Sequence, residues 1–239
     1  MLFSIVSPVY NEETVIEDVV RKWETIIAEN SIDGEIVLTN DGSTDGTSEI
    51  LKNLQKEFSN LKVITLDSNN GYGMALATSV KRSEGKYIIT IDSDGQFDLA
   101  EYPLLYDKLI KEKLDVVTGY RKNKKDTFLK TIADRILNSI IKFLFGLQLR
   151  DSNCALKLLD GNLFRKITIE AKGYPAPTEI LIKSSLLGTK IGEVGVNHYH
   201  RSGGESKLKT FSTGLNMLGF IIYLRYKIFL YKQRVINSI

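Results

Sequence analysis

The sequence predicts an α/β fold in which a mainly parallel central sheet is flanked by helices. Short β-branched runs alternate with longer stretches of helical pattern through the first half of the chain, which is typical of βαβ units. Polar and acidic residues follow several of these runs directly, where a parallel sheet presents its carboxyl ends. These observations favour a single α/β domain that binds its ligand at one edge of the sheet.

Each element follows from the local pattern in chain order. Strands are expected at 3–7, 35–39, 62–66, 87–91 and 115–118, which are short runs rich in Val, Ile, Leu, Tyr and Thr. Helices are expected between them, at 13–29, 48–57, 73–83 and 99–113. After Arg121 the alternation stops, because 127–149 is one long helical stretch, and a strand is expected at 154–159. We expect a main domain over 1–210 and a C-terminal amphipathic helical elaboration over 211–239.

Composition limits the classes of function. The chain has 239 residues, 43% hydrophobic and 26% charged, which is enough for one domain with a full core. The net charge of +3 is too small to indicate a nucleic acid partner, although it suits a protein that meets phosphates or an anionic membrane surface. The single cysteine, Cys154, excludes a cysteine-based zinc site and fits a reducing, cytosolic setting. The N-terminal residues are expected to form a strand rather than a signal peptide.

An acidic turn follows the fourth expected strand, in the stretch TIDSDGQFD (90–98). Asp92 and Asp94 would point to opposite faces of a regular strand, but a turn containing Gly95 lets them converge. Mg²⁺ and Mn²⁺ are commonly held by one or two carboxylates, with substrate phosphates and waters completing the coordination. The turn therefore indicates half of a metal and diphosphate site, and the motif alone leaves a solvated acidic turn as the alternative.

A set of motifs occurs in a specific order along the chain: PVYNE (8–12), NDGSTDGT (40–47), NNGYGMA (69–75), DSDGQFD (92–98), GYR (119–121) and RSGGESK (201–207). Together they resemble the family 2 glycosyltransferases, from residue 3 to about residue 209. The chain looks most like the branch that makes polyprenyl-phosphate sugars, the dolichyl-phosphate mannose synthases and their bacterial relatives. The resemblance implies a Rossmann-like GT-A fold and inverting, metal-dependent transfer of a mannosyl or glucosyl group from a nucleotide-diphosphate sugar to dolichyl or undecaprenyl phosphate.

One segment departs from that branch. Relatives usually carry a Ser-Gly-Phe-like stretch after the aspartate that corresponds to Asp151, whereas here the chain reads Asp-Ser-Asn-Cys-Ala-Leu-Lys (151–157). The resemblance therefore leaves the acceptor-side pocket and the identity of the sugar open.

The resemblance also implies which residues contact the donor. It places Pro8, Tyr10, Glu12, Thr39 and Asp41 around the base and ribose, and Asp92, Ser93, Gln96 and Lys207 on the rest of the donor. Carboxylates at strand ends can accept from base N–H or ribose hydroxyl groups, although Glu12 would also suit the first turn of a helix. Asp94 is the first choice as a ligand of Mg²⁺ or Mn²⁺, followed by Gln96 and Asp92.

A lipid monophosphate acceptor would be mostly dianionic near neutral pH, so it would need cations more than a general base. The candidates for the acceptor phosphate are Arg121, Arg135, Ser139 and Arg201, and those for catalysis are Asp94, Arg121, Arg135 and Arg201. Arginine binds phosphate as a bidentate fork, and Arg135 and Ser139 are four residues apart on one helical face. An apolar stripe around Arg135 leaves open a solvated charge on an amphipathic helix.

Three further positions carry side chains that can take part in catalysis: Glu179, His198 and His200. Glu179 begins an expected helix, where an acid favourably meets the helix dipole, and the family often places an acid there near the acceptor. A hydroxyl acceptor, the second enzyme hypothesis, would need such a carboxylate as its base. His198 and His200 are expected to have packing or surface roles. A non-catalytic nucleotide-binding scaffold is the hypothesis from a different class, and the intact Asp92, Asp94, Arg121 and Arg201 speak against it.

The C-terminal stretch 211–234 bears on the membrane. Its uncharged core, 215–224, is about half the roughly 20 residues that a spanning helix needs, and Arg225 and Lys227 then interrupt it. An interfacial helix is expected, with a core or homo-oligomer helix as the alternative. We therefore expect a cytoplasmic protein that is peripherally associated with the inner face of the membrane and has no nucleic acid partner.

Overall fold

A computed structural model describes residues 1–122, 128–200 and 210–233, with side chains described at 1–122, 134–200 and 214–233. The strands are β1 (Phe3–Val9), β2 (Gly34–Asn40), β3 (Leu61–Thr65), β4 (Tyr87–Thr90), β5 (Val116–Arg121), β6 (Lys157–Asp160) and β7 (Ile191–Val196). The helices are α1 (Ile16–Glu29), α2 (Thr47–Glu57), α3 (Tyr72–Arg82), the 3₁₀ turn η1 (Leu99–Glu101), α4 (Tyr102–Glu112), α5 (Phe128–Phe145), α6 (Gly161–Phe164), α7 (Ala176–Leu186) and α8 (Thr210–Lys232).

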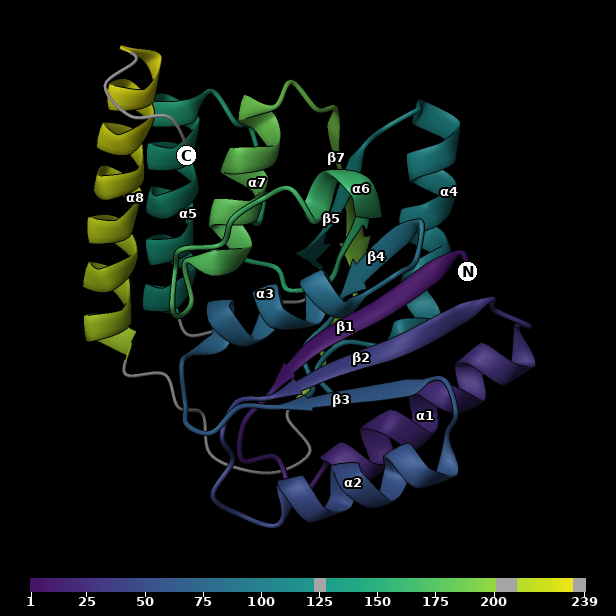
Figure 1. The fold of residues 1–239 in the computed structure, drawn as a ribbon. Coiled ribbons are helices and arrows are strands. Elements are labelled where there is room, and N and C mark those ends of the chain that lie inside the picture. The colour runs from purple at the N-terminus through teal and green to yellow at the C-terminus, as the bar shows by residue number, and fades with distance from the viewer. Residues whose placement is uncertain (123–127, 201–209, 234–239) are drawn as a thin grey trace.

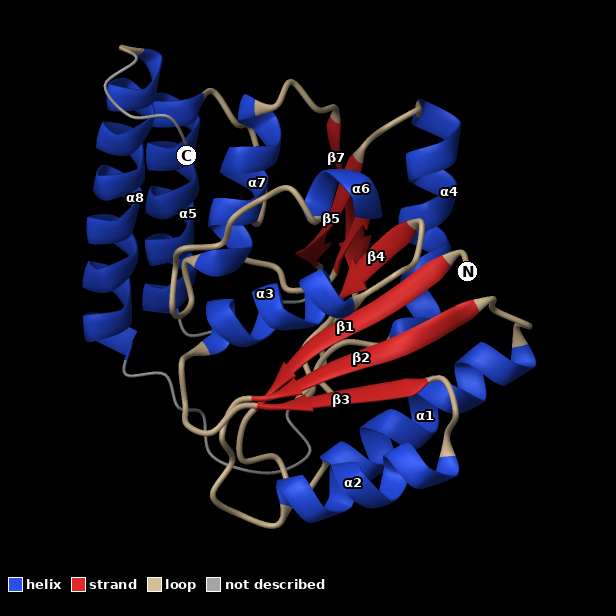
Figure 2. Ribbon diagram, viewed as in Figure 1, coloured by secondary structure: helices blue, strands red, loops and turns tan. Residues whose placement is uncertain are grey.

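The strands of the described residues form one sheet in the order β3-β2-β1-β4-β6-β5-β7. All neighbouring pairs are parallel except those of β6, which runs antiparallel to both β4 and β5. The sheet lies between two layers of helices (Figure 2). The mainly parallel α/β sheet that the sequence predicts is therefore confirmed.

Alternate residues of the central strands pack into two separate cores. Ile5 and Ile36 belong to the cluster that includes residues of α1, α2 and α4. Their neighbours Val6 and Val37 belong to the cluster that includes residues of α3, α6 and α7. This period of two is what a strand buried on both faces requires, and it explains the nearly continuous apolar runs of β1 and β2.

Several boundaries differ from the expected ones for identifiable reasons. The expected helix 99–113 is divided, because the carboxylate of Asp98 accepts a hydrogen bond from the N–H of Ala100 and starts the short turn η1. The expected helix 127–149 ends at Phe145, before Gly146, which has a φ of +74°. A glycine in this left-handed region commonly ends a helix. The strand expected from Cys154 begins only at Lys157.

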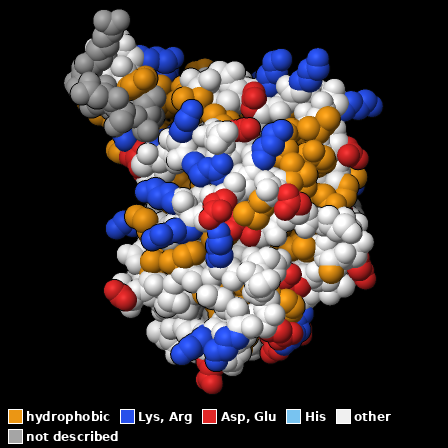
Figure 3. Space-filling model, turned by 45° about the vertical axis from the view of Figure 1, so that its right-hand side comes forward, with side chains coloured by type: hydrophobic (Ala, Val, Ile, Leu, Met, Phe, Trp, Pro, Cys, Tyr) orange, Lys and Arg blue, Asp and Glu red, His pale blue; other side chains and the backbone are white. Residues whose placement is uncertain are grey.

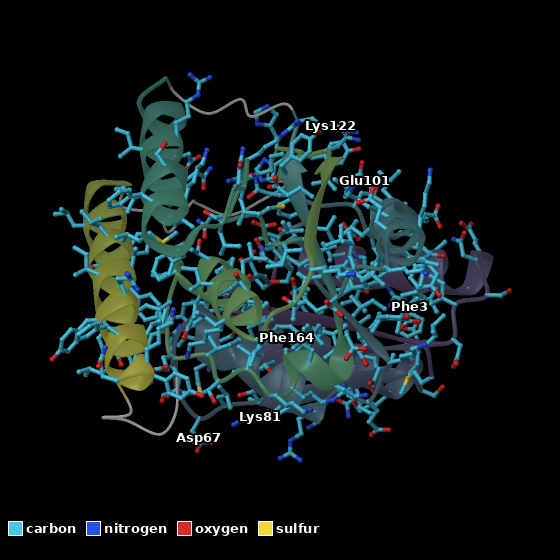
Figure 4. All side chains as sticks on the ribbon, turned by 90° about the horizontal axis from the view of Figure 1, so that it is seen from above. Phe3, Asp67, Lys81, Glu101, Lys122 and Phe164 are labelled. Carbon is cyan, nitrogen blue, oxygen red and sulfur yellow. The ribbon has the colours of Figure 1, made fainter. Side chains whose placement is uncertain are left out.

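Helices α5 and α8 lie side by side outside the sheet layers, both in Figure 1 and in the view from above in Figure 4. Four residues of α8, Met217, Ile221, Leu224 and Ile228, are buried in a third cluster with Ile141 and Leu147 and with Ile182 of α7. Their spacing places them on one helical stripe. Helix α8 thus packs on the rest of the chain through this stripe, while the domain boundary at residue 210 stays a prediction.

The surface of the molecule carries charges of both signs. Lys and Arg side chains are spread over the face in Figure 3, among acidic and apolar side chains. No helix among the described residues is long and apolar enough to cross a lipid bilayer.

Candidate active site

A pocket of roughly 360 Å³ opens at the carboxyl ends of β1, β2 and β4. Parallel sheets bind their ligands at this edge, as the sequence analysis expects. Its lining comes from four parts of the chain: Pro8, Val9, Tyr10, Glu12 and Asp41 at or just after the ends of β1 and β2, Asn69, Gly71 and Tyr72 before and in α3, Asp92, Ser93 and Asp94 after β4, and Lys172, Gly173 and Tyr174 before α7.

The acidic turn has the geometry that its glycine predicts. Gly95 has a φ of +75°, and both Asp92 and Asp94 line the pocket. The backbone N–H of Gln96 donates to Oδ1 of Asp94 over 3.0 Å, which closes the turn. The hydroxyl of Ser93 donates to the carbonyl of Pro8 over 2.9 Å and ties the turn to β1. The two carboxylates therefore converge on one cavity.

Asp92 is in an electrostatically unfavourable position. Burial and the nearby carboxylate of Asp94 raise the pKa of Asp92 to about 7, although the hydroxyl of Tyr72, which donates to its Oδ1 over 2.9 Å, opposes this rise. A divalent cation between the two carboxylates would relieve the repulsion, and carboxylate oxygens are the ligands that Mg²⁺ and Mn²⁺ prefer. The residues present therefore fit such an ion.

The protein supplies only part of the coordination that such an ion needs. Within the described part of the chain, no group of three or more His, Cys, Asp and Glu side chains is placed to hold a metal. The Nε2 of Gln96 donates to the carbonyl of Tyr199 over 3.1 Å, and Gln96 is not part of the pocket lining. Ligation of a metal by the amide oxygen of Gln96 stays a prediction. A cation here would complete its coordination with substrate oxygens and water.

The donor residues expected near β1 and β2 divide into two groups. Pro8, Tyr10, Glu12 and Asp41 line the pocket. Thr39 does not, because it is fully buried and its hydroxyl is hydrogen bonded to that of Ser79 over 2.7 Å. Thr39 thus connects β2 to α3 rather than facing a ligand.

Asp41 also holds the turn before α3, which forms another wall of the pocket. Its two carboxylate oxygens accept from the backbone N–H groups of Asn70 and Gly71, each over 2.8 Å. This arrangement fixes the turn that leads into α3, from which Asn69 and Tyr72 reach the pocket. The NNGYGMA motif (69–75), to which Asn69, Gly71 and Tyr72 belong, contains none of the site residues expected from the sequence.

A second wall that the sequence did not predict is the segment 170–174. Its backbone packs directly on the start of α3: a Cβ added at Gly73 would lie 1.7 Å from the carbonyl oxygen of Ala171, and one at Gly71 would lie 2.2 Å from that of Lys172. The N–H of Gly73 donates to the Lys172 carbonyl over 3.1 Å. Only glycine permits this approach, so the NNGYGMA motif was the available signal for the contact.

Arg121 is not free to act as a phosphate fork in this structure. Its Nε and Nη2 bind the two carboxylate oxygens of Asp151 over 2.7 and 3.0 Å, in a partly buried bidentate pair. Burial alone would lower the pKa of Arg121, but the pairing with Asp151 raises it above its usual value. The placement at the end of β5 is confirmed, and the partner in this structure is a carboxylate.

The reversed direction of β6 brings an unexpected charge to this edge. Lys157 is fully buried and pairs with Thr90 of β4 and Thr118 of β5. Its Nζ donates to the carbonyl of Cys154. Burial lowers the pKa of Lys157, and its charge in turn opposes the raised pKa of Asp92. A lysine in an apolar strand pattern was the sequence signal for this position.

The remaining acceptor candidates are only partly described. Arg135 and Ser139 are exposed on α5, and the Ser139 hydroxyl donates to the Arg135 carbonyl over 2.8 Å, so the shared helical face is confirmed. Arg201 and Lys207 lie outside the described residues. Phosphate binding by these four residues stays a prediction.

Glu179 begins α7 as expected, but it is poorly placed to act as a base. It is fully buried, accepts from the N–H groups of Glu170 and Ala171, and pairs with Lys183 over 2.8 Å. His198 has a packing contact, with its ring centroid 5.0 Å from that of Phe97.

Several known proteins resemble this chain in sequence. A dodecaprenyl-phosphate galacturonate synthase of Rhizobium johnstonii is 30% identical over 94% of the chain, which corresponds to 68% of that protein. An undecaprenyl-phosphate 4-deoxy-4-formamido-L-arabinose transferase of Salmonella choleraesuis is 31% identical over 85% of the chain and 62% of that protein. The chain thus spans about two thirds of the length of these relatives.

Solved structures share the fold. A glucosyl-3-phosphoglycerate synthase from Mycobacterium tuberculosis, solved with Mn²⁺, UDP-glucose and phosphoglyceric acid, aligns with a TM-score of 0.73 over 94% of this chain and 79% of its own, at 20% identity. The GT-A-like architecture is therefore established at the level of the fold. A family profile described as Glycosyl transferase family 2 matches residues 4–170. With that match and a relative that is 30% identical over 94% of the present sequence, this chain belongs to glycosyl transferase family 2.

Proposed function

We propose that this family 2 glycosyltransferase moves a sugar from a nucleoside-diphosphate sugar to a polyprenyl phosphate. The observation that carries the proposal is the pair Asp92 and Asp94, which converge on the same cavity as Glu12 and Asp41. Both similar curated proteins have names that describe transfer to a polyprenyl phosphate, which supports this class of acceptor.

In this proposal the donor occupies the pocket with its base and ribose near Pro8, Tyr10 and Glu12, and its diphosphate near the acidic turn. Asp94, with Asp92, would hold Mg²⁺ or Mn²⁺ against the phosphates. The cation would stabilise the nucleoside diphosphate as it leaves. The Mn²⁺ in the structure of similar fold supports a divalent ion without deciding between the two metals.

The nucleophile would be an oxygen of the lipid phosphate. It would form a bond to the anomeric carbon as the bond from that carbon to the diphosphate breaks, which inverts the configuration. Arg135, Ser139 and Arg201 are the proposed contacts of the acceptor phosphate, and Lys207 a contact of the donor. Since Arg121 pairs with Asp151, we assign it to the electrostatics of the site rather than to direct binding. The engaged position of Glu179 weakens the alternative with a hydroxyl acceptor.

The proposed location is the inner face of a membrane, where polyprenyl phosphates are anchored. Helix α8 presents an exposed apolar face opposite its buried stripe: Leu215, Leu218, Ile222, Tyr226 and Phe229. Arg225 and Lys232 are exposed on the same helix, and such a mixture suits an anionic interface. A second copy of the chain is the other proposed partner for this face.

The transferred sugar is proposed only as a class. A mannosyl or glucosyl group is expected from the resemblance, whereas the similar proteins are named for galacturonate and a formamido-arabinose. The deciding experiment incubates purified protein with labelled nucleotide sugars, a polyprenyl phosphate and Mg²⁺ or Mn²⁺. A lipid-soluble labelled product from one donor is expected. Transfer only to a soluble glycan, or no transfer from any donor, would overturn the proposal.

A further inference from the structure

One wall of the pocket is connected to a helix that takes no part in its lining. The wall is the segment 170–174, from which Lys172, Gly173 and Tyr174 face the cavity. The helix is α8, none of whose described residues lines the pocket. Glu170 stands at the start of this wall, and its side chain contacts α8.

The backbone of this wall is held in place by hydrogen bonds to α7 and to the start of α3. The N–H groups of Glu170 and Ala171 donate to the buried carboxylate of Glu179 over 3.0 and 2.9 Å. The carbonyl of Lys172 accepts from the N–H of Gly73 at the start of α3. The position of residues 170–172 therefore bears directly on Tyr72, whose hydroxyl contacts Asp92.

The side chain of Glu170 is held from α8. Its Oε1 lies 2.7 Å from Nζ of Lys227, and its Oε2 accepts from the hydroxyl of Tyr223 over 2.9 Å. Lys183 of α7 completes the arrangement, with Nζ 2.5 Å from Oε1. Tyr223 and Lys227 are four residues apart, so they present one face of α8 to the same carboxylate.

The interaction is less exposed to solvent than an ordinary surface ion pair. Glu170 is 22% exposed and Lys227 20% exposed, so solvent screens their charges only in part. Although burial would raise the pKa of Glu170, hydrogen bonds from Lys183 and Lys227 lower it to about 2. The carboxylate is therefore charged, with three donors in place, throughout the physiological range.

We propose that Glu170 is a positioning residue that couples the placement of helix α8 to the pocket wall 170–174, and thereby to donor binding. The coupling runs from Lys227 and Tyr223 through the Glu170 carboxylate to its own backbone, and from there to the start of α3. The effect on donor binding rests on the proposed function, whereas the mechanical link does not. A change in α8, such as its arrival at a lipid surface, would alter the affinity of a site that none of the described side chains of this helix lines.

The test uses the full chain and substitutions on α8 itself. Lys227→Met removes the charge and keeps the length of the side chain, and Tyr223→Phe removes one hydroxyl. We expect faster hydrogen exchange at the amides of Glu170, Ala171 and Gly73, while amides of β1 report any global loss of stability. For Lys227→Met we expect about fivefold weaker binding of UDP or GDP by calorimetry, with a similar rise in the donor KM and kcat within about twofold.

Matched controls separate coupling from a general loss of stability. Tyr231→Phe alters an exposed tyrosine of the same helix, and Lys108→Met breaks the ion pair with Glu112 on α4. Both are expected to leave local exchange and nucleotide affinity unchanged. Glu170→Gln should reproduce the effect of Lys227→Met, and adding Lys227→Met to it should weaken binding no further, because the shared interaction is already lost.

The inference fails if Lys227→Met and Glu170→Gln leave exchange at Ala171 and Gly73 as in the wild type. It also fails if exchange rises while nucleotide affinity in a nucleotide-binding wild type is unchanged. A wild type that binds neither UDP nor GDP would overturn the proposed function instead. Hydrogen exchange would still decide the link between α8 and the wall.

Discussion

The two sides of the pocket differ in how their polar groups are held. On the side proposed to bind the nucleotide, here the nucleotide side, carboxylates are fixed by backbone N–H groups: Asp41 by those of Asn70 and Gly71, and Asp94 by that of Gln96. On the side proposed to bind the acceptor, here the acceptor side, the Arg121 guanidinium is fixed by the side chain of Asp151, and Arg135 is exposed on α5. The nucleotide side is thus preorganised by turns, and the acceptor side by pairs of side chains distant in sequence.

This difference has a physical consequence. A carboxylate bound to a turn cannot move without losing its hydrogen bonds to backbone N–H groups. Because asparagine keeps an acceptor oxygen for such a bond, this substitution should affect chemistry more than folding. A buried pair of opposite charges couples both partners to stability, because the loss of one leaves the other without compensation. Substitutions on the two sides should therefore separate in their effects on activity and on stability.

The largest effect is expected on the nucleotide side. Asp94→Asn should lower turnover by at least about a hundredfold with an intact fold, because it weakens metal ligation without a change in volume. Turnover and the near-ultraviolet circular dichroism spectrum would be measured together. Asp98→Asn, in the same acidic stretch, is the matched control and should retain activity. Full activity in Asp94→Asn, or in wild type after exhaustive chelation, would contradict the metal role.

The second effect concerns stability on the acceptor side. Asp151→Asn leaves the largely buried guanidinium of Arg121 without its charged partner, and should lower the free energy of unfolding by about 3 kcal/mol. Urea denaturation measures this. Glu112→Gln, which breaks the more exposed pair with Lys108, should cost less than about 1 kcal/mol. An equal loss of unfolding free energy in Asp151→Asn and Glu112→Gln would contradict the idea that the buried pair on the acceptor side is coupled to stability.

The third effect tests the exposed acceptor cation. Arg135→Ala should lower acceptor kcat/KM roughly ten- to a hundredfold, as expected for a charged hydrogen bond to phosphate, with donor affinity unchanged. Arg135→Lys keeps the charge but loses the fork, so a substantial loss there would indicate bidentate recognition. Lys142→Ala, another exposed cation of α5, is the control. Wild-type acceptor kinetics in Arg135→Ala would remove this residue from the site.

The smallest expected effect concerns the hydrogen bond from Tyr72 to Asp92 on the nucleotide side. Tyr72→Phe removes the hydroxyl that donates to Asp92, so metal-dependent donor binding should weaken about fivefold, the worth of one hydrogen bond of roughly 1 kcal/mol. Titration of Mn²⁺ in the presence of UDP or GDP would measure it. Tyr106→Phe, in the core against Phe3 and Tyr87, should leave this affinity unchanged.

The difference between local turns and side-chain pairs distant in sequence also explains which features could be predicted from the sequence. The strands, the helices between them and the acidic turn follow local patterns, and Gly95 indicated that Asp92 and Asp94 would converge. The wall 170–174, the pairing of Arg121 and the engagement of Glu179 depend on contacts with residues far away in the sequence. The sequence of β6, which begins at Lys157, gave no indication that this strand runs antiparallel, because the period-two pattern of burial is the same in both directions.

The position of β6 has a consequence for how the chain acquires its structure. Strand β4 pairs with β1 on one side, but its other edge stays unpaired until residues 157–160 are available to insert between β4 and β5. A ribosome that has released only the first 120 residues would therefore carry a four-stranded sheet with an apolar free edge, Tyr87–Thr90. Such an edge can pair with another nascent chain. Insertion of β6, and with it the burial of Lys157, is thus expected to be a late step of synthesis that is vulnerable to such pairing.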